Sequence, residues 1–138
     1  MKNRVMKTMM ALTMTAALTV SMAAGAVSVM AADEKDPKDV KVALVLPGSA
    51  NDKGWNQEAY DGLEKIKDLG CETAYSENVQ ASDYETIFRG YADQGFNVVF
   101  GHGTEFEDAA EKVAEDYPDT IFCITSSDIS QDPNVCSL

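Results

Sequence analysis

From residue 40 onward, short apolar runs alternate with longer stretches in which apolar residues recur at helical spacing. The first run, residues 40–46, is almost continuously apolar and ends at Pro47-Gly48, which is typical of a strand covered on both faces of a parallel sheet. We therefore expect the order β-α-β-α-β-α-β-β. The expected strands are residues 40–46, 72–75, 97–100, 120–125 and 135–138.

The helical stretches carry recognisable start signals. The first follows a turn at residues 51–54. The other two follow Ser82–Glu85 and Thr104–Glu107, each of which has the Ser/Thr-x-x-Glu spacing of a capping box. Acidic residues of the third helix lie mostly off its apolar stripe, which predicts a solvated face.

This alternation predicts the α/β fold class: a doubly wound, mostly parallel sheet with helices on both faces and right-handed crossovers. The flavodoxin-like strand order 2-1-3-4-5 is the natural expectation. The sequence stops at Leu138 inside a strand-like run with no closing helix, so we expect one lobe of a larger protein, with apolar surface left on its last strand.

The first 39 residues differ from the rest. Residues 1–7 are basic and residues 8–30 carry no charge, which is typical of a secretory signal peptide, here residues 1–31 with cleavage after Ala31. An uncleaved membrane anchor is the alternative. No cysteine stands at the cleavage point for lipid attachment. Residues 32–39 form a polar linker, and residues 40–138 form the lobe, which we expect to be exported.

The net charge of −12 argues against nucleic acid or an anionic membrane surface as a partner. The spacing of the three cysteines and one histidine matches no metal motif, so no metal site and no cofactor are expected. A disulfide framework is not expected either. Cys123 and Cys136, both in apolar runs, are expected to behave as small buried hydrophobes.

In an open parallel sheet, ligands bind beyond the carboxyl ends of the strands, where the strand order reverses. The loop after the first strand holds Trp55, the only tryptophan, with Asn56 beside it and Asn51 and Asp52 just before. An indole face can stack on a ligand while amides and carboxylates supply directional hydrogen bonds. The alternative is structural: Trp55 covers the core, and Asn51 or Asp52 caps the helix.

The loop after the third strand reads Gly101-His102-Gly103-Thr104. Its glycines let the backbone approach a ligand closely. It is not a dinucleotide fingerprint, because Phe106 stands where the third glycine would be. No nucleophile elbow accompanies His102, so a binding or structural role is favoured over catalysis.

These loops resemble the BMP family (basic membrane protein, Med or PnrA-like) of substrate-binding proteins for ABC transporters. The resemblance covers residues 42–138 and is most specific in the first loop. The matching residues are Leu46 to Gln57, Ala59 to Leu63, Gly101 to Gly103 with Phe106, Asp108 and Ala109, and Pro133 to Val135.

The resemblance implies one lobe of a type I periplasmic-binding-protein fold, with ligand held between two lobes. It further implies a purine nucleoside or nucleobase as ligand, stacked on Trp55, and ABC permease subunits as partners that bring the protein to the membrane. The ligand-binding residues expected on this basis are Asn51, Asp52, Trp55, Asn56, Gly101, His102, Gly103 and Phe106.

Two other functions stay open from the residues alone. One is an enzyme of flavodoxin-like or hydrolase type that uses His102 with Asp52 or Asp128. The other is a sensory domain of the same fold. The leading hypothesis is a solute receptor without catalytic turnover, whose lobes close over the ligand as in other periplasmic binding proteins.

Overall fold

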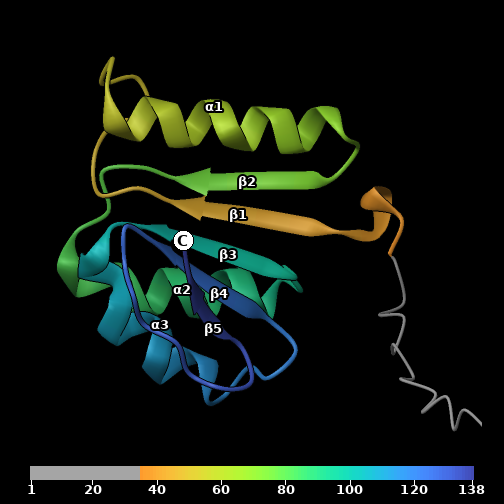
Figure 1. Ribbon diagram of the computed structural model, residues 1–138, viewed down its shortest axis with the longest axis vertical. Coiled ribbons are helices and arrows are strands. Elements are labelled where there is room, and N and C mark those ends of the chain that lie inside the picture. Colours follow the sequence, from red (N-terminus) through yellow and green to blue (C-terminus); the bar gives the residue numbers. More distant parts are fainter. Residues whose placement is uncertain (1–34) are drawn as a thin grey trace, which may run out of the picture. The chain divides into compact units, whose positions relative to one another are not determined.

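The computed structural model describes residues 35–138, and the predicted signal peptide lies outside them. These residues form a five-stranded, all-parallel sheet in the order β2-β1-β3-β4-β5 (Figure 1). The strands are β1 (Lys41–Val45), β2 (Glu72–Ser76), β3 (Val98–His102), β4 (Ile121–Thr125) and β5 (Val135–Ser137). The helices are α1 (Trp55–Asp68), α2 (Tyr84–Asp93) and α3 (Glu107–Ala114). The predicted element order and strand order are both confirmed.

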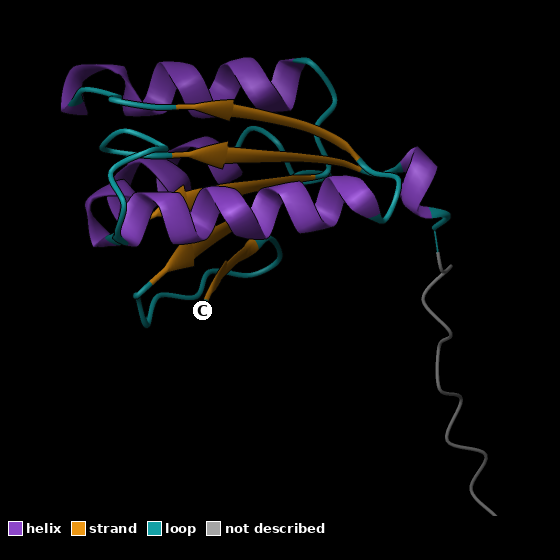
Figure 2. Cartoon of the chain, turned by 90° about the horizontal axis from the view of Figure 1, so that it is seen from above, coloured by secondary structure: helices purple, strands orange, loops and turns teal. Residues whose placement is uncertain are grey.

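One face of the sheet carries two helices. Helices α2 and α3 lie together on it, as Figures 1 and 2 show. Between them and the sheet, Phe88, Phe106 and Phe122 are completely buried, with ring centroids 5.7 Å apart along the stack. Aromatic side chains contribute large buried areas, so this layer provides most of the hydrophobic stabilisation.

The opposite face carries α1 alone, which packs on β1 and β2. Its cluster is smaller and consists of Val42, Leu44, Leu46, Ala50 and Leu63. Beyond α1 the sheet is less covered: Ile121 on β4 is 46% exposed, and Cys136 on β5 is exposed as well. The expected apolar surface near the last strands is therefore present.

The predicted capping boxes do not form. A short 3-10 turn precedes each helix, at Ala81–Asp83 and at Thr104–Phe106, and no side chain caps α2 or α3. Glu85 instead bonds Lys112, 2.8 Å away across the two helices. The turn shifts each helix start past the Ser or Thr, so the glutamate is no longer at the third helical position.

The expectation that Cys136 is a buried hydrophobe is wrong, because β5 is an edge strand and this side chain is exposed. Cys123, on the strand inside it, is buried as expected.

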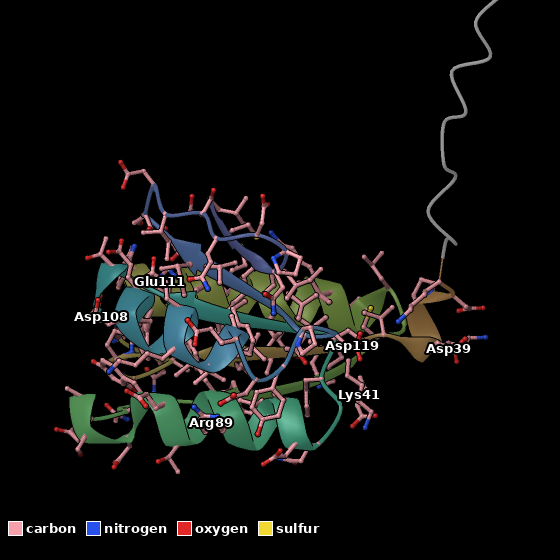
Figure 3. All side chains as sticks on the ribbon, turned by 90° about the horizontal axis from the view of Figure 1, so that it is seen from below. Asp39, Lys41, Arg89, Asp108, Glu111 and Asp119 are labelled. Atoms are coloured by element: carbon pink, nitrogen blue, oxygen red, sulfur yellow. The ribbon has the colours of Figure 1, made fainter. Side chains whose placement is uncertain are left out.

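The solvent side of α2 and α3 is polar, and Figure 3 shows Arg89, Asp108 and Glu111 on these helices. Asp108 is exposed, in agreement with the predicted solvated face. Arg89 pairs with Asp116 at 2.6 Å. Within residues 35–138, no helix has the length and apolar character needed to cross a bilayer.

Candidate functional site

Trp55 and His102 meet at the carboxyl edge of the sheet. Trp55 is the first residue of α1, and His102 is the last of β3. Their rings stack with centroids 3.7 Å apart and planes inclined by 26°. The two loops that the strand order was expected to bring together are therefore in direct contact.

Both ring nitrogens of His102 are engaged. Nε2 lies 3.1 Å from the carbonyl oxygen of Trp55, and Nδ1 lies 2.8 Å from the hydroxyl of Thr125 on β4. A carbonyl can only accept, so Nε2 carries the proton and Nδ1 accepts from Thr125. Burial lowers the pKa of His102, which keeps the imidazole neutral at pH 7. His102 therefore serves as a platform that fixes the indole ring.

This stacking leaves Trp55 with one free face. The residue is 43% exposed although the histidine covers it on one side. A ligand cannot enter between two rings 3.7 Å apart. Any planar ligand that uses Trp55 must stack on its outer face.

Asp52 binds the N–H groups at the start of α1, although Gly54 and not Asp52 holds the N-cap position of that helix. Its carboxylate accepts backbone N–H bonds from Gly54 at 2.8 Å and from Asn56 and Gln57 at 3.1 Å. It also accepts from the Asn56 side-chain amide at 2.8 Å. The bonds from the Asn56 side chain and from Gly54 lower the pKa of Asp52 to about 2. Asp52 thus positions the site residues Trp55 and Asn56 by fixing the start of their helix.

Asn56 has one group still available. Its Nδ2 donates to Asp52, but its buried Oδ1 has no hydrogen-bond partner among residues 35–138. Buried acceptors are almost always bonded, so this oxygen calls for a donor that residues 35–138 do not supply. Gly48 makes room for the amide, because a Cβ at that position would lie 2.5 Å from Asn56 Nδ2.

Glu77, which follows β2, anchors the first loop and was missed by the sequence analysis. Its Oε2 accepts the Ala50 N–H at 2.6 Å and the Ser49 hydroxyl at 3.3 Å. No motif marked it, since a single acid after a strand carries no signal. Asn51 is exposed at the tip of the same loop, and its N–H donates to the Ser49 hydroxyl.

The glycines of the second loop have different roles. Gly103 has φ +129°, and a Cβ there would lie 2.9 Å from the Trp55 ring and collide with the Glu105 carboxylate. A Cβ on Gly101 would instead lie 2.8–2.9 Å from Ile124, Phe106 and Phe88 in the core. Gly103 thus belongs to the tryptophan site, whereas Gly101 is needed for core packing.

Phe106 does not join the other predicted site residues. Its side chain is fully buried and packs against Tyr84, with centroids 4.3 Å apart, and against Phe88. The 3-10 turn after Gly103 directs it under the sheet edge, onto the α2–α3 face. It supports the glycine loop from beneath and does not line the site.

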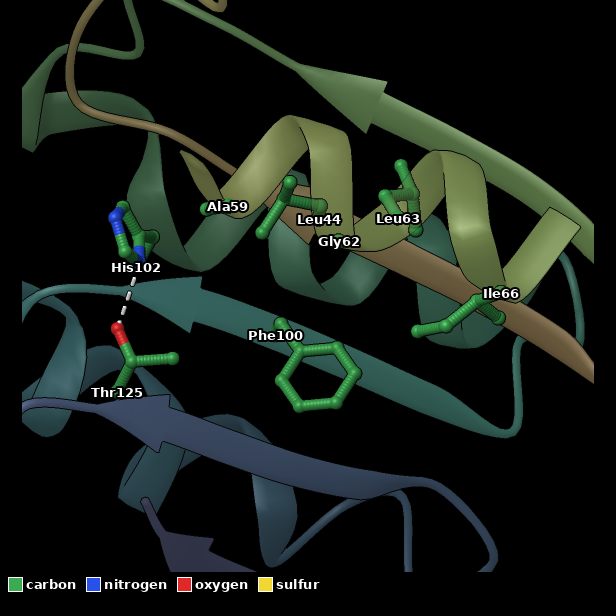
Figure 4. Close-up of a pocket in the computed structure, with 8 residues that line it drawn as sticks. All are labelled: Leu44, Ala59, Gly62, Leu63, Ile66, Phe100, His102 and Thr125. Carbon is green, nitrogen blue, oxygen red and sulfur yellow. Dashed lines mark hydrogen bonds between the residues drawn. The ribbon is translucent and has the colours of Figure 1, made fainter. Parts of the chain in front are cut away.

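A cavity of about 230 Å³ extends from His102 along the inner side of α1 (Figure 4). Figure 4 shows His102 and Thr125 at one end of it and Ile66 toward the other. The wall is apolar and comprises Leu44, Ala59, Gly62, Leu63, Ile66 and Phe100, besides His102 and Thr125. Among the described residues no group of three His, Cys, Asp or Glu side chains is placed to hold a metal.

The family of this chain follows from its similarity to known proteins. The sequence model of a family described as "ABC transporter substrate-binding protein PnrA-like" (Bmp) matches residues 39–138. A Lactococcus lactis protein named ABC transporter nucleoside-binding protein BmpA is 34% identical over 105 residues, which cover 72% of this chain and 30% of that protein. A Bacillus subtilis protein named transcriptional activator protein med is 32% identical, over 71% of this chain and 31% of its own length.

The fold is likewise similar to solved structures. A solute-binding protein of an ABC transporter system from Conexibacter woesei superposes with a TM-score of 0.63 at 27% identity, over 71% of this chain and 34% of that one. The chain thus spans about a third of the length of these relatives.

Proposed function

The chain belongs to the Bmp family of PnrA-like ABC transporter substrate-binding proteins, and from this premise we propose that it is an exported receptor lobe that binds a purine nucleoside or nucleobase for an ABC importer. One observation carries the proposal: the indole of Trp55 stacks on His102 and keeps an exposed face at the carboxyl edge of the sheet, one residue before Asn56, whose amide oxygen has no partner among the described residues. The Lactococcus relative, whose name states nucleoside binding, supports the same ligand class.

The two groups suit a purine. A heteroaromatic base offers a flat π face for the outer side of Trp55. Purines also carry N–H donors on the ring edge, and Asn56 Oδ1 is an acceptor one residue from the indole. An aliphatic ligand would satisfy neither the stacking surface nor the orphaned oxygen, which costs free energy while it stays unbonded.

The mechanism is binding followed by closure. The base stacks on Trp55, which His102 and Gly103 hold in place. The Asn56 amide oxygen, which is buried before the ligand arrives, accepts a hydrogen bond from the edge of the base after its side chain turns outward. A second lobe covers the other side of the base and supplies further contacts, as in hinged periplasmic binding proteins. The closed form docks on the permease, and no bond of the ligand is broken.

The test is a calorimetric titration of the full chain with adenosine, inosine, guanosine and adenine, with glucose as the comparison ligand. We expect saturable heat for at least one purine and none for glucose. Trp55 is the only tryptophan, so its fluorescence should change over the same concentration range.

Two variants and a control locate the binding. Trp55→Ala and Asn56→Ala are each expected to weaken purine binding at least about tenfold, a loss of about 1.4 kcal/mol. Tyr75→Ala removes an aromatic ring of similar exposure, 44%, on β2 and should leave affinity unchanged. No heat with any purine, or equal affinity in all three variants, would refute the proposal.

A further inference from the structure

Cys123 and Cys136 face each other across two neighbouring strands. They are register partners in the parallel pair β4–β5. Register partners project from the same face of a sheet, and adjacent strands lie about 4.8 Å apart. That spacing falls within the Cα separation of about 4.4–6.8 Å that disulfides require.

The two strands are held in this register on both sides of the cysteine pair. Phe122 donates its N–H to the Asn134 carbonyl at 2.8 Å, and Leu138 donates to Ile124 at 3.0 Å. The buried Asn134 side-chain amide lies 2.8–3.2 Å from three carbonyl oxygens, of Ala114, Tyr117 and Thr120. The entry to β5 is therefore fixed to the core, and the meeting of the two thiols is built into the fold.

The two thiols have different surroundings. Cys123 is 4% exposed, and burial, together with the neighbouring Cys136, raises its pKa to about 12. Cys136 is exposed on the edge strand and can be reached by a reagent from solvent. Cys71, the third cysteine, lies just before β2 beside the α1 cluster and has no cysteine partner in register.

We propose that Cys123 and Cys136 are an oxidisable pair that closes into a disulfide by exchange with a small disulfide such as oxidised glutathione. The Cys136 thiolate attacks the glutathione disulfide, forming a mixed disulfide and releasing one glutathione thiolate. That thiolate takes up a proton. The Cys123 sulfur then attacks the sulfur of Cys136, loses its proton to the second departing glutathione, and completes the bond.

The balance is one glutathione disulfide reduced to two thiols and one protein dithiol oxidised. The product ties β5 to β4 across the loop of residues 124–135, so the last strand can no longer separate from the sheet. Among the described residues β5 pairs with β4 alone, so the bond ties down a strand that few backbone hydrogen bonds hold.

The test is native oxidation of the full chain with oxidised glutathione, followed by acid quench, alkylation and mass spectrometry. We expect a product lighter by two hydrogen atoms, with only Cys71 alkylated and a peptide in which Cys123 and Cys136 are linked. Three alkylated cysteines, a stable glutathione adduct on Cys136, or a disulfide-linked dimer would overturn the proposal.

Variants separate the two steps. Cys71→Ser should oxidise as the parent chain does. Cys136→Ser, an exposed substitution that leaves the core intact, should leave Cys123 unmodified by glutathione. Cys123→Ser should stop at the glutathione adduct on Cys136, and oxidised parent chain should unfold at a higher urea concentration than the reduced chain. Rapid reaction of Cys123 in Cys136→Ser would contradict the assigned order of attack.

Discussion

The two faces of the sheet differ in how they are packed. The α2–α3 face is closed by an aromatic stack, with Phe88, Phe106 and Phe122 fully buried. The α1 face is covered by one helix, retains a cavity, and ends at a partly exposed tryptophan. The comparison teaches that buried aromatic packing is concentrated on one side and the proposed ligand-binding surface on the other, although both use the same strands.

The test with the largest expected effect compares two phenylalanines on neighbouring strands. Phe122→Ala empties a fully buried position on the α2–α3 face and should lower the free energy of unfolding by about 3–5 kcal/mol. Phe100 is half-buried beside the cavity and removes less apolar area from water on folding. Phe100→Ala should therefore lower the free energy of unfolding by about 1 kcal/mol. Urea unfolding measures both, and equal losses would contradict the division.

The glycine loop allows a finer comparison within a few residues. Gly101→Ala forces a methyl group against Ile124, Phe106 and Phe88, and should cost about 1–3 kcal/mol of stability by overpacking.

Gly103→Ala should also lower the free energy of unfolding by about 1–3 kcal/mol, because alanine cannot adopt the backbone conformation of Gly103 without strain. Only Gly103→Ala should displace the indole and weaken purine binding. Calorimetry on both variants decides the point, and weakened binding in Gly101→Ala alone would reverse the assignment.

A smaller effect is expected from pH. Burial lowers the pKa of His102 below its ordinary value of 6.5, while the charges of Glu105, Asp52 and Glu58 oppose that shift. The unfolded chain therefore takes up this proton at a higher pH than the folded chain does. The contribution of His102 to stability is complete above the unfolded pKa and is lost as the pH falls below it toward the folded pKa.

We expect the urea midpoint to fall between about pH 7.5 and pH 5.5. The fall should be smaller in His102→Gln, whose amide does not titrate. Asp52, with a pKa of about 2, stays ionised over this interval and does not confuse the result. An identical pH dependence in both proteins would show that His102 is not the group responsible.

The strand order and the contact between Trp55 and His102 followed from the sequence, because alternating apolar runs fix the sheet topology and topology fixes which loops meet. The capping boxes failed because a 3-10 turn shifts the helix start by a few residues, which local motifs do not encode. The prediction that Cys136 is buried was wrong because the edge position of its strand depends on the order of the strands in the sheet.

The candidate site was only partly predictable for a related reason. Sequence spacing placed Phe106 near the glycine loop, but the side of the sheet on which its ring lies depends on the backbone of the intervening turn. The role of Glu77 could not be predicted from the sequence, because it depends on a contact between two loops that are far apart along the chain. The orphaned Asn56 oxygen emerged only from the full set of hydrogen bonds around Asp52.

The central claim is that Trp55 provides the binding surface while the opposite face keeps the chain folded. The most direct measurement is the rise in the free energy of unfolding on addition of the best-binding purine, determined by urea titration in the parent chain and in Trp55→Ala. At a hundredfold excess over Kd the parent chain should gain about 2.7 kcal/mol. Trp55→Ala should stay folded without ligand and gain far less at the same concentration, whereas an equal gain in both proteins would contradict the account.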